Sequence, residues 1–280
     1  MEDQKQMNET VIYLKLGGSL ITNKDIPYEV EDSILGMLSA EISYFLKNSS
    51  GAKLIIGHGS GSFGHTSASK YQTRQGVASH EEWLGFQKVC FDARSLNQIV
   101  VHSLQAAGVP AISFPPSTQV ITNNHKISIW ETTQIQLSLE NGLVPVIFGD
   151  TVFDSTIGGT ILSTEELFFH LAEIIPPTRI LLAGIEEGVW SGYPHRDEII
   201  KTITPSNYSL IKSQLHSSAS VDVTGGMTTK IESMLNLIKI HPNLSIHVFS
   251  GRTRGNLSTV LSGSNLGTEI SNDQKGESHD

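Results

Sequence analysis

Short, largely apolar segments recur along the chain, each bounded by turn-forming residues. Six of them stand out, at residues 11–16, 53–56, 109–114, 143–148, 179–183 and 244–249. Runs of four to six such residues between turns are typical of strands that are buried on both faces. The segments therefore predict the strands of a covered sheet.

Between these segments, apolar residues recur every three or four positions, as expected of helices with one buried face. The predicted helices are residues 28–47, 81–107, 132–140, 163–175, 224–240 and 255–261. Two further segments, 120–130 and 151–162, place turn residues between β-rich arms and predict hairpins.

Strands that alternate with helices predict an α/β protein with a mainly parallel sheet covered on both faces. In such sheets, ligands bind beyond the carboxyl ends of the strands. Three of the predicted strands end in glycine-containing turns, which are Gly17 with Gly18, residues 57–65, and Gly149 with Asp150. We expect these turns to share one edge of the sheet.

Length and charge narrow the function. The 280 residues suit a single domain over residues 1–270, followed by a polar tail at 271–280. A net charge of −9 argues against partners that bind through bulk negative charge, namely nucleic acids and anionic membranes. The single cysteine excludes an intramolecular disulfide and fits the reducing cytoplasm, and residues 1–10 lack the apolar core of a signal peptide.

The first candidate site is the string Lys15-Leu-Gly-Gly-Ser19, with Lys24 beyond it. Gly17 and Gly18 allow backbone amides to approach a phosphate closely, and both lysines could neutralise its charge. Phosphoryl transfer depends mainly on such positioning and neutralisation. The alternative is an ordinary glycine turn beside two solvated lysines.

The second candidate is residues 57–65, in which four glycines and two serines follow a buried strand. A loop of this composition presents many amide donors to an anion, and His65 could donate to a second one. The alternative is a flexible loop with a surface histidine. The string is not a nucleotide P-loop, and the dinucleotide fingerprint lacks its acidic residue.

Two further candidates carry opposite charges. Gly226 and Lys230 open a predicted helix, where amide donors and the helix dipole favour phosphate; the alternative is an ordinary capped helix. Asp150 could orient Lys15 or Lys24, or bind Mg²⁺ through water; the alternative is a simple strand-end turn. The histidines show no metal-site spacing, so no metal ligands are predicted in the protein itself.

Three strings in this order, KLGGSLITNK, GHGSGSFGH and DVTGGM-x-x-K, resemble the amino acid kinase superfamily over residues 11–270. The Ser-Phe-Gly-His that ends at His65 resembles the isopentenyl phosphate kinase family in particular. The resemblance implies an open αβα sandwich of the amino acid kinase fold and a homodimer. Its substrate lobe would cover residues 1–175 and its nucleotide lobe residues 176–270.

The resemblance also implies a reaction, in which ATP with Mg²⁺ phosphorylates isopentenyl phosphate to isopentenyl diphosphate in isoprenoid biosynthesis. Lys15 and Lys24 would then stabilise the transferring phosphoryl group, and Asp150 would organise them. His65 would hold the phosphate of the substrate. Further contacts to the substrate are implied for the backbone of Ser60 and Gly61 and for Gly149.

The implied nucleotide contacts are Lys15, Gly17, Gly18, Ser19, Gly61, Gly226 and Lys230. An isopentenyl tail needs a small apolar pocket, for which we predict Phe86 and Ile161.

Two strings depart from the superfamily pattern. Ile185 replaces the first aspartate of Thr-Asp-Val-Asp-Gly-Val-Tyr, and Ser163-Thr-Glu-Glu166 stands for Ser-Gly-Asp-Asp. Both departures concern the base and ribose contacts, and therefore the preference for ATP. Two alternatives remain open, a kinase of another phosphate or phosphonate such as fosfomycin, and a silent module that only binds ligand.

Overall fold

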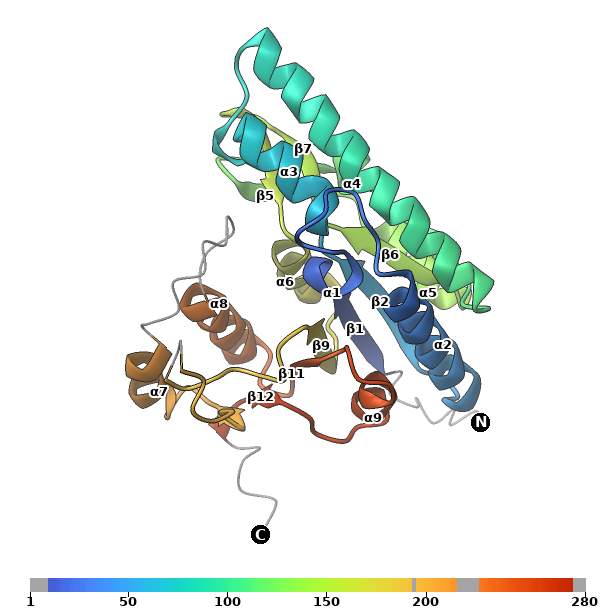
Figure 1. Ribbon diagram of the computed structural model, residues 1–280, viewed down its shortest axis with the longest axis vertical. Coiled ribbons are helices and arrows are strands. Elements are labelled where there is room, and N and C mark those ends of the chain that lie inside the picture. Colours follow the sequence, from blue (N-terminus) through green and yellow to red (C-terminus); the bar gives the residue numbers. More distant parts are fainter. Residues whose placement is uncertain (1–9, 193–194, 216–226, 274–280) are drawn as a thin grey trace, which may run out of the picture.

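The computed structural model describes residues 10–192, 195–215 and 227–273. Their main sheet has the order β10-β12-β11-β9-β1-β2-β6-β3 (Figure 1). Every neighbouring pair in it is parallel except β11 with β12. The eight strands, in chain order, are β1 (Val11–Leu16), β2 (Lys53–His58), β3 (Ala111–Ser113), β6 (Val144–Phe148), β9 (Arg179–Gly184), β10 (Thr202–Ile203), β11 (Ser245–Ser250) and β12 (Thr268–Ile270).

Helices cover both faces of this sheet, which confirms the predicted α/β sandwich (Figure 1). Side chains alternate along β1, so that Ile12, Leu14 and Leu16 enter one core while Tyr13 enters the other. The first core includes residues of α2 (Asp32–Asn48), α4 (His80–Ala106) and α9 (Asn256–Leu261). The second includes residues of α5 (Thr133–Glu140), α6 (Thr164–Ile174), α7 (Tyr208–Leu215) and α8 (Met227–Ile240).

A second, four-stranded sheet has the order β5-β4-β7-β8 and contains the two predicted hairpins. Its strands are β4 (Val120–Asn123), β5 (Lys126–Trp130), β7 (Asp150–Asp154) and β8 (Gly158–Leu162). Only Gly149 separates β7 from β6. The chain therefore passes directly from the main sheet to the small one at the end of β6.

Residues 57–65 are not the continuous loop that the glycines suggest. Strand β2 includes Gly57 and His58, and α3 (Gly61–Tyr71) begins three residues later. Glycine is required here for steric reasons. A Cβ at Gly57, for example, would collide with Thr164 and Phe168. Other elements missed by the sequence patterns are α1 (Gly18–Ile21), the 3₁₀ turns η1 (Thr73–Gln75) and η2 (Pro116–Thr118), β10, α7 and β12.

Helix α4 begins one residue before the predicted start because Ser79 caps it. The Ser79 hydroxyl accepts the amide of Glu82, and the Glu82 carboxylate accepts the amide of Ser79. Within the described residues, no helix is both long and apolar enough to cross a membrane.

Candidate active site

A cavity of about 620 Å³ opens where β1, β2 and β6 end. The predicted turns meet there, because Gly17, Gly18, Gly59 and Gly149 all line it. The geometry thus brings the three turns to one edge of the sheet, as expected for a parallel sheet.

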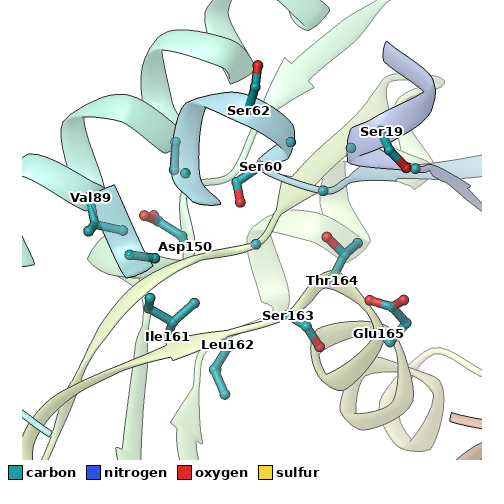
Figure 2. Close-up of a pocket in the computed structure, with 18 of the residues that line it drawn as sticks. Ser19, Ser60, Ser62, Val89, Asp150, Ile161, Leu162, Ser163, Thr164 and Glu165 are labelled. Carbon is teal, nitrogen blue, oxygen red and sulfur yellow. The ribbon is translucent and has the colours of Figure 1, made fainter. Parts of the chain in front are cut away.

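Two glycine turns touch each other in the cavity wall. A Cβ at Gly18 would lie 2.8 Å from the Cα of Gly61, and one at Gly59 would lie 2.9 Å from the Gly18 nitrogen. The amide of Gly17 already donates to the carbonyl of Ala183 at 2.8 Å, so it serves the fold. Ser19 and Ser60 also line the cavity (Figure 2).

Helix α3 directs its N-terminus toward the cavity. Ser60, Gly61, Ser62 and Gly64 from its first turn are lining residues. Amides in the first turn of a helix lack partners within that helix, and the dipole makes this end positive. The Ser62 amide donates to the Thr22 hydroxyl at 2.9 Å, so the dipole together with the amides of Ser60 and Gly61 can bind an anion. His65 is part of α3, but its side chain lies outside what the structure describes.

Three lysines line the same cavity, namely Lys15 from the end of β1, Lys24 beyond α1 and Lys230 from the first turn of α8. Lys24 is exposed, whereas only 16% of the Lys15 side chain is accessible. The structure thus brings the two lysines of the N-terminal segment together with one from α8, far along the chain. Gly226, the predicted neighbour of Lys230, lies outside the described residues.

Lys15 forms an ion pair with Glu165, whose side chain is 14% exposed. Burial alone would raise the pKa of Glu165, but the charges of Lys15 and Lys230 reverse this effect and lower it. The ionised carboxylate therefore faces two of the three lysines. Figure 2 shows Glu165 at the start of α6, beside Thr164.

Asp150 lines the cavity, but its hydrogen bonds lie elsewhere than predicted. It accepts the hydroxyl and amide of Ser117 and the amide of Thr151. Burial raises the pKa of Asp150 to about 6, although the hydrogen bonds from Ser117 act to lower it. The carboxylate paired with Lys15 is Glu165, and Asp150 lies in the lining of the same cavity.

Glu165 and Arg74 are the two charged lining residues that sequence reasoning missed. Arg74 forms a bidentate ion pair with Glu166, in which Nη1 donates to Oε2 at 2.9 Å and Nη2 to Oε1 at 2.8 Å. Arg74 also donates to the carbonyl of Ile161. The signal available in the sequence was the capping box of Ser163 and Glu166, which starts α6 at the cavity and so places the adjacent Glu165 in its lining. Glu165 thus pairs with Lys15, and Glu166 pairs with Arg74.

The apolar side chains of the cavity are those of Val89, Ala93 and Ile161, while the side chain of Leu162, another lining residue, packs in the second core. Figure 2 shows Val89 and Ile161 close together near Asp150. The predicted Phe86 is not among the described residues that line it. Its ring packs against Trp83 and Phe153 instead, with centroid distances of 5.2 Å to each.

His58 is fully buried behind the cavity and holds the turn that follows β2. Its Nδ1 lies 3.0 Å from the Gly59 carbonyl, which can only accept, so Nδ1 carries the proton. Its Nε2 then accepts from the Asn97 amide at 3.1 Å. Burial lowers the pKa of His58 to about 4, so the ring is neutral at pH 7.

This lowered pKa predicts an acid-sensitive fold. The unfolded chain binds the His58 proton near pH 6.5, and the folded chain binds it only near pH 4. Stability is therefore lost as the pH falls through this window, by at most about 3 kcal/mol from this group. Urea unfolding at several pH values should show that the free energy of unfolding falls less steeply with falling pH in His58→Gln than in the wild type. The same dependence on pH in both proteins would contradict a lowered pKa at His58.

Among the described residues, no group of three or more His, Cys, Asp or Glu side chains is placed to hold a metal ion. A Mg²⁺ ion that enters with a nucleotide needs fewer protein ligands, since phosphates and water complete its octahedron. The donor set of the cavity fits that mode of binding, since Asp150 and Glu165 are its acidic side chains.

Comparison with known proteins agrees with the geometry. Residues 10–250 match the model of the amino acid kinase family. The isopentenyl phosphate kinase of Methanocaldococcus jannaschii is 34% identical over 264 residues, covering 92% of this chain and 97% of that protein. That of Methanothermobacter thermautotrophicus is 32% identical over 270 residues, covering 93% and 98%.

Solved structures give the same result. A structure described as an X-ray structure of isopentenyl phosphate kinase superimposes with a TM-score of 0.78 at 28% identity. It covers 93% of this chain and is itself covered completely. A product complex of the Thermoplasma acidophilum enzyme, at 21% identity and a TM-score of 0.74, supports the fold.

Proposed function

The chain belongs to the amino acid kinase family and, within it, to the isopentenyl phosphate kinases, and from this premise we propose its reaction. It transfers the γ-phosphoryl group of ATP to isopentenyl phosphate, which gives isopentenyl diphosphate and ADP. One observation carries the proposal to this substrate. A single cavity joins a phosphate-binding end, rich in lysines and amides, to a small apolar end.

The apolar end suits a short hydrocarbon tail. Val89, Ala93 and Ile161 offer no charged group to it. Burial of apolar surface is favourable by about 25 cal/mol per Å², so this wall favours a tail over a polar acceptor. Fosfomycin, which carries a phosphonate and a much smaller carbon skeleton, would leave more of the wall exposed.

The chemistry requires little covalent help from the protein. An oxygen of the acceptor phosphate attacks the γ-phosphorus, and the bond from that phosphorus to the bridging oxygen of ADP breaks. The attacking oxygen is already ionised, so no general base is needed. The barrier comes from the repulsion of two anions, which Lys15, Lys24 and the first amides of α3 oppose.

We assign the acceptor phosphate to His65 and to the amides of Ser60 and Gly61, beside Gly149. The ATP phosphates then lie against the turn of Gly17, Gly18 and Ser19, with further contacts from Gly61, Gly226 and Lys230. This assignment follows the motif positions, and it uses the cavity edge at which the described members of the set meet.

Glu165 and Asp150 receive different roles in this proposal. Glu165 holds Lys15 in the wall and balances Lys230, so that the lysines keep their place between turnovers. Asp150 holds the 3₁₀ turn at Ser117 beside the cavity. Glu165 and Asp150 are the carboxylates of the cavity that would lie near a Mg²⁺ ion bound to the ATP phosphates, and such an ion would supply further neutralisation of charge.

The remaining proposals concern the whole molecule. Residues 1–175 form the substrate lobe and residues 176–270 the nucleotide lobe. The protein works in the cytoplasm as a homodimer, as the family resemblance implies. A mass of 30.5 kDa by light scattering, the mass of one chain, would show that the protein is a monomer.

A coupled assay of ADP release tests the function. Isopentenyl phosphate, dimethylallyl phosphate and fosfomycin are offered separately, each with ATP and Mg²⁺. The proposal expects turnover with the prenyl phosphates. Turnover with fosfomycin alone would show that the acceptor is a phosphonate, and binding without any turnover would indicate a silent module.

Replacing His65 by alanine should lower kcat/KM for isopentenyl phosphate by roughly 10²-fold, because the acceptor phosphate loses a hydrogen-bond donor. The KM for ATP should stay near the wild-type value. The matched control is His102→Ala, which removes an exposed histidine of α4 and should leave the kinetics unchanged. Wild-type kinetics in His65→Ala would show that His65 does not bind the acceptor phosphate.

A further inference from the structure

Thr22 connects the two glycine turns through one hydroxyl group. The Thr22 hydroxyl donates to the Gly18 carbonyl at 2.8 Å and accepts the Ser62 amide at 2.9 Å. Gly18 belongs to the turn after β1, and Ser62 belongs to the first turn of α3. Both the donor and the acceptor capacity of the hydroxyl are thus used between the two turns.

The Thr22 hydroxyl is tightly packed between the two turns. Thr22 is 1% exposed. A Cβ at Gly61 would overlap the Thr22 hydroxyl and would lie 2.8 Å from the Gly18 carbonyl oxygen. Because the turns are in van der Waals contact around the hydroxyl, a shift of either turn must break a hydrogen bond or move the other.

Thr22 also fixes the start of the segment that carries Lys24. Its amide donates to the Gly18 carbonyl at 3.0 Å, and its backbone pairs with Val30 in an antiparallel bridge. Lys24 lies two residues further along and lines the cavity. One buried residue therefore sets the positions of Gly18, Ser62 and Lys24 relative to one another.

We propose that Thr22 is a positioning residue for the reaction, whose hydroxyl holds the two phosphate-binding turns at a fixed separation. The inference rests on the proposed function, in which one turn holds ATP and the other holds the acceptor phosphate. Transfer needs the two reacting atoms at about 3–3.5 Å, and a misplacement of 1 Å can cost about 10²-fold. Rigid turns meet this need where separately mobile turns would not.

The test compares three substitutions of Thr22. Valine has the same shape without the hydroxyl, serine keeps the hydroxyl without the methyl group, and alanine lacks both. We expect Thr22→Val and Thr22→Ala to lower kcat by about 10- to 100-fold, with KM changes of less than about 5-fold, because binding survives when alignment is lost. Thr22→Ser should stay within about 3-fold of the wild type in kcat.

A second measurement tests the hydrogen bond between Ser62 and Thr22 without relying on turnover. Amide hydrogen exchange at Ser62 should be faster in Thr22→Val than in the wild type and near the wild-type rate in Thr22→Ser. Unchanged exchange in Thr22→Val would overturn the link. A lowered melting temperature with unchanged kcat would also overturn the proposal, because the role would then be structural alone.

The wild type separates the two possible failures. If the wild type does not turn over isopentenyl phosphate, the proposed function falls, and exchange at Ser62 still decides whether Thr22 joins the turns. If the wild type is active and Thr22→Val keeps its kcat, only the inference about Thr22 falls.

Discussion

Lys15→Met is expected to lower kcat for isopentenyl phosphate by about 10³-fold, because it removes a buried positive charge from the site of transfer. The Lys15 side chain is mostly shielded from solvent, so its charge is weakly screened by water and salt. Methionine keeps a long unbranched chain and much of the packing. The KM for the acceptor should change far less than kcat.

The ion pair with Glu165 requires a control. Lys15→Met alone removes the ion-pair partner of Glu165, and a poorly solvated carboxylate that loses its partner can disturb the cavity wall by itself. The double variant Lys15→Met, Glu165→Gln removes both charges. If kcat stays low in the double variant, the positive charge is what the reaction needs.

Lys126→Met serves as the matched control, since Lys126 is exposed on β5 and does not line the cavity. It should keep wild-type kinetics. Full activity of Lys15→Met, or recovery of activity in the double variant, would show that Lys15 supports the structure rather than the transfer.

Gly61→Ala should have the second largest effect, with kcat/KM reduced by more than about 10²-fold. Gly61 has a backbone φ of +49°, where a side chain is strained, and the new methyl group would overlap the Thr22 hydroxyl. Relief of that overlap must separate the turns of Gly18 and Gly61. The free energy of unfolding should also fall, by about 2–4 kcal/mol.

Gly36→Ala is the matched control for this substitution. Gly36 lies within α2, and a Cβ there would meet no atom within 4 Å. Alanine in a helix interior is favoured over glycine by about 1 kcal/mol, so this variant should be active and slightly more stable. A Gly61→Ala protein with wild-type stability and turnover would show that the two turns are not in contact.

The sequence predicted the elements whose patterns are local. The 27-residue helix α4 has an apolar stripe and a capping box, and both hairpins have turn residues between β-rich arms. Helix α3 was missed because its glycines suggested a loop. Those glycines, Gly61 and Gly64, allow close contacts with Thr22 and Ser60, which no local pattern reveals.

The same limit applies to the charged residues of the site. Lys15 and its partner Glu165 are separated by 150 positions, and Asp150 is 33 positions from Ser117. Both carboxylates follow plausible turns, so the sequence could not tell which one would reach a lysine. Phe86 was placed on the correct face of α4, but its neighbour Phe153 comes from the second sheet.

Phosphorus NMR of the reaction mixture identifies both the acceptor and the new bond in one experiment. Wild-type protein is mixed with ATP, Mg²⁺ and isopentenyl phosphate. We expect the phosphomonoester signal to decline while the two coupled doublets of a prenyl diphosphate grow in step with ADP. Growth of ADP with inorganic phosphate alone, while isopentenyl phosphate remains unchanged, would contradict the proposed function.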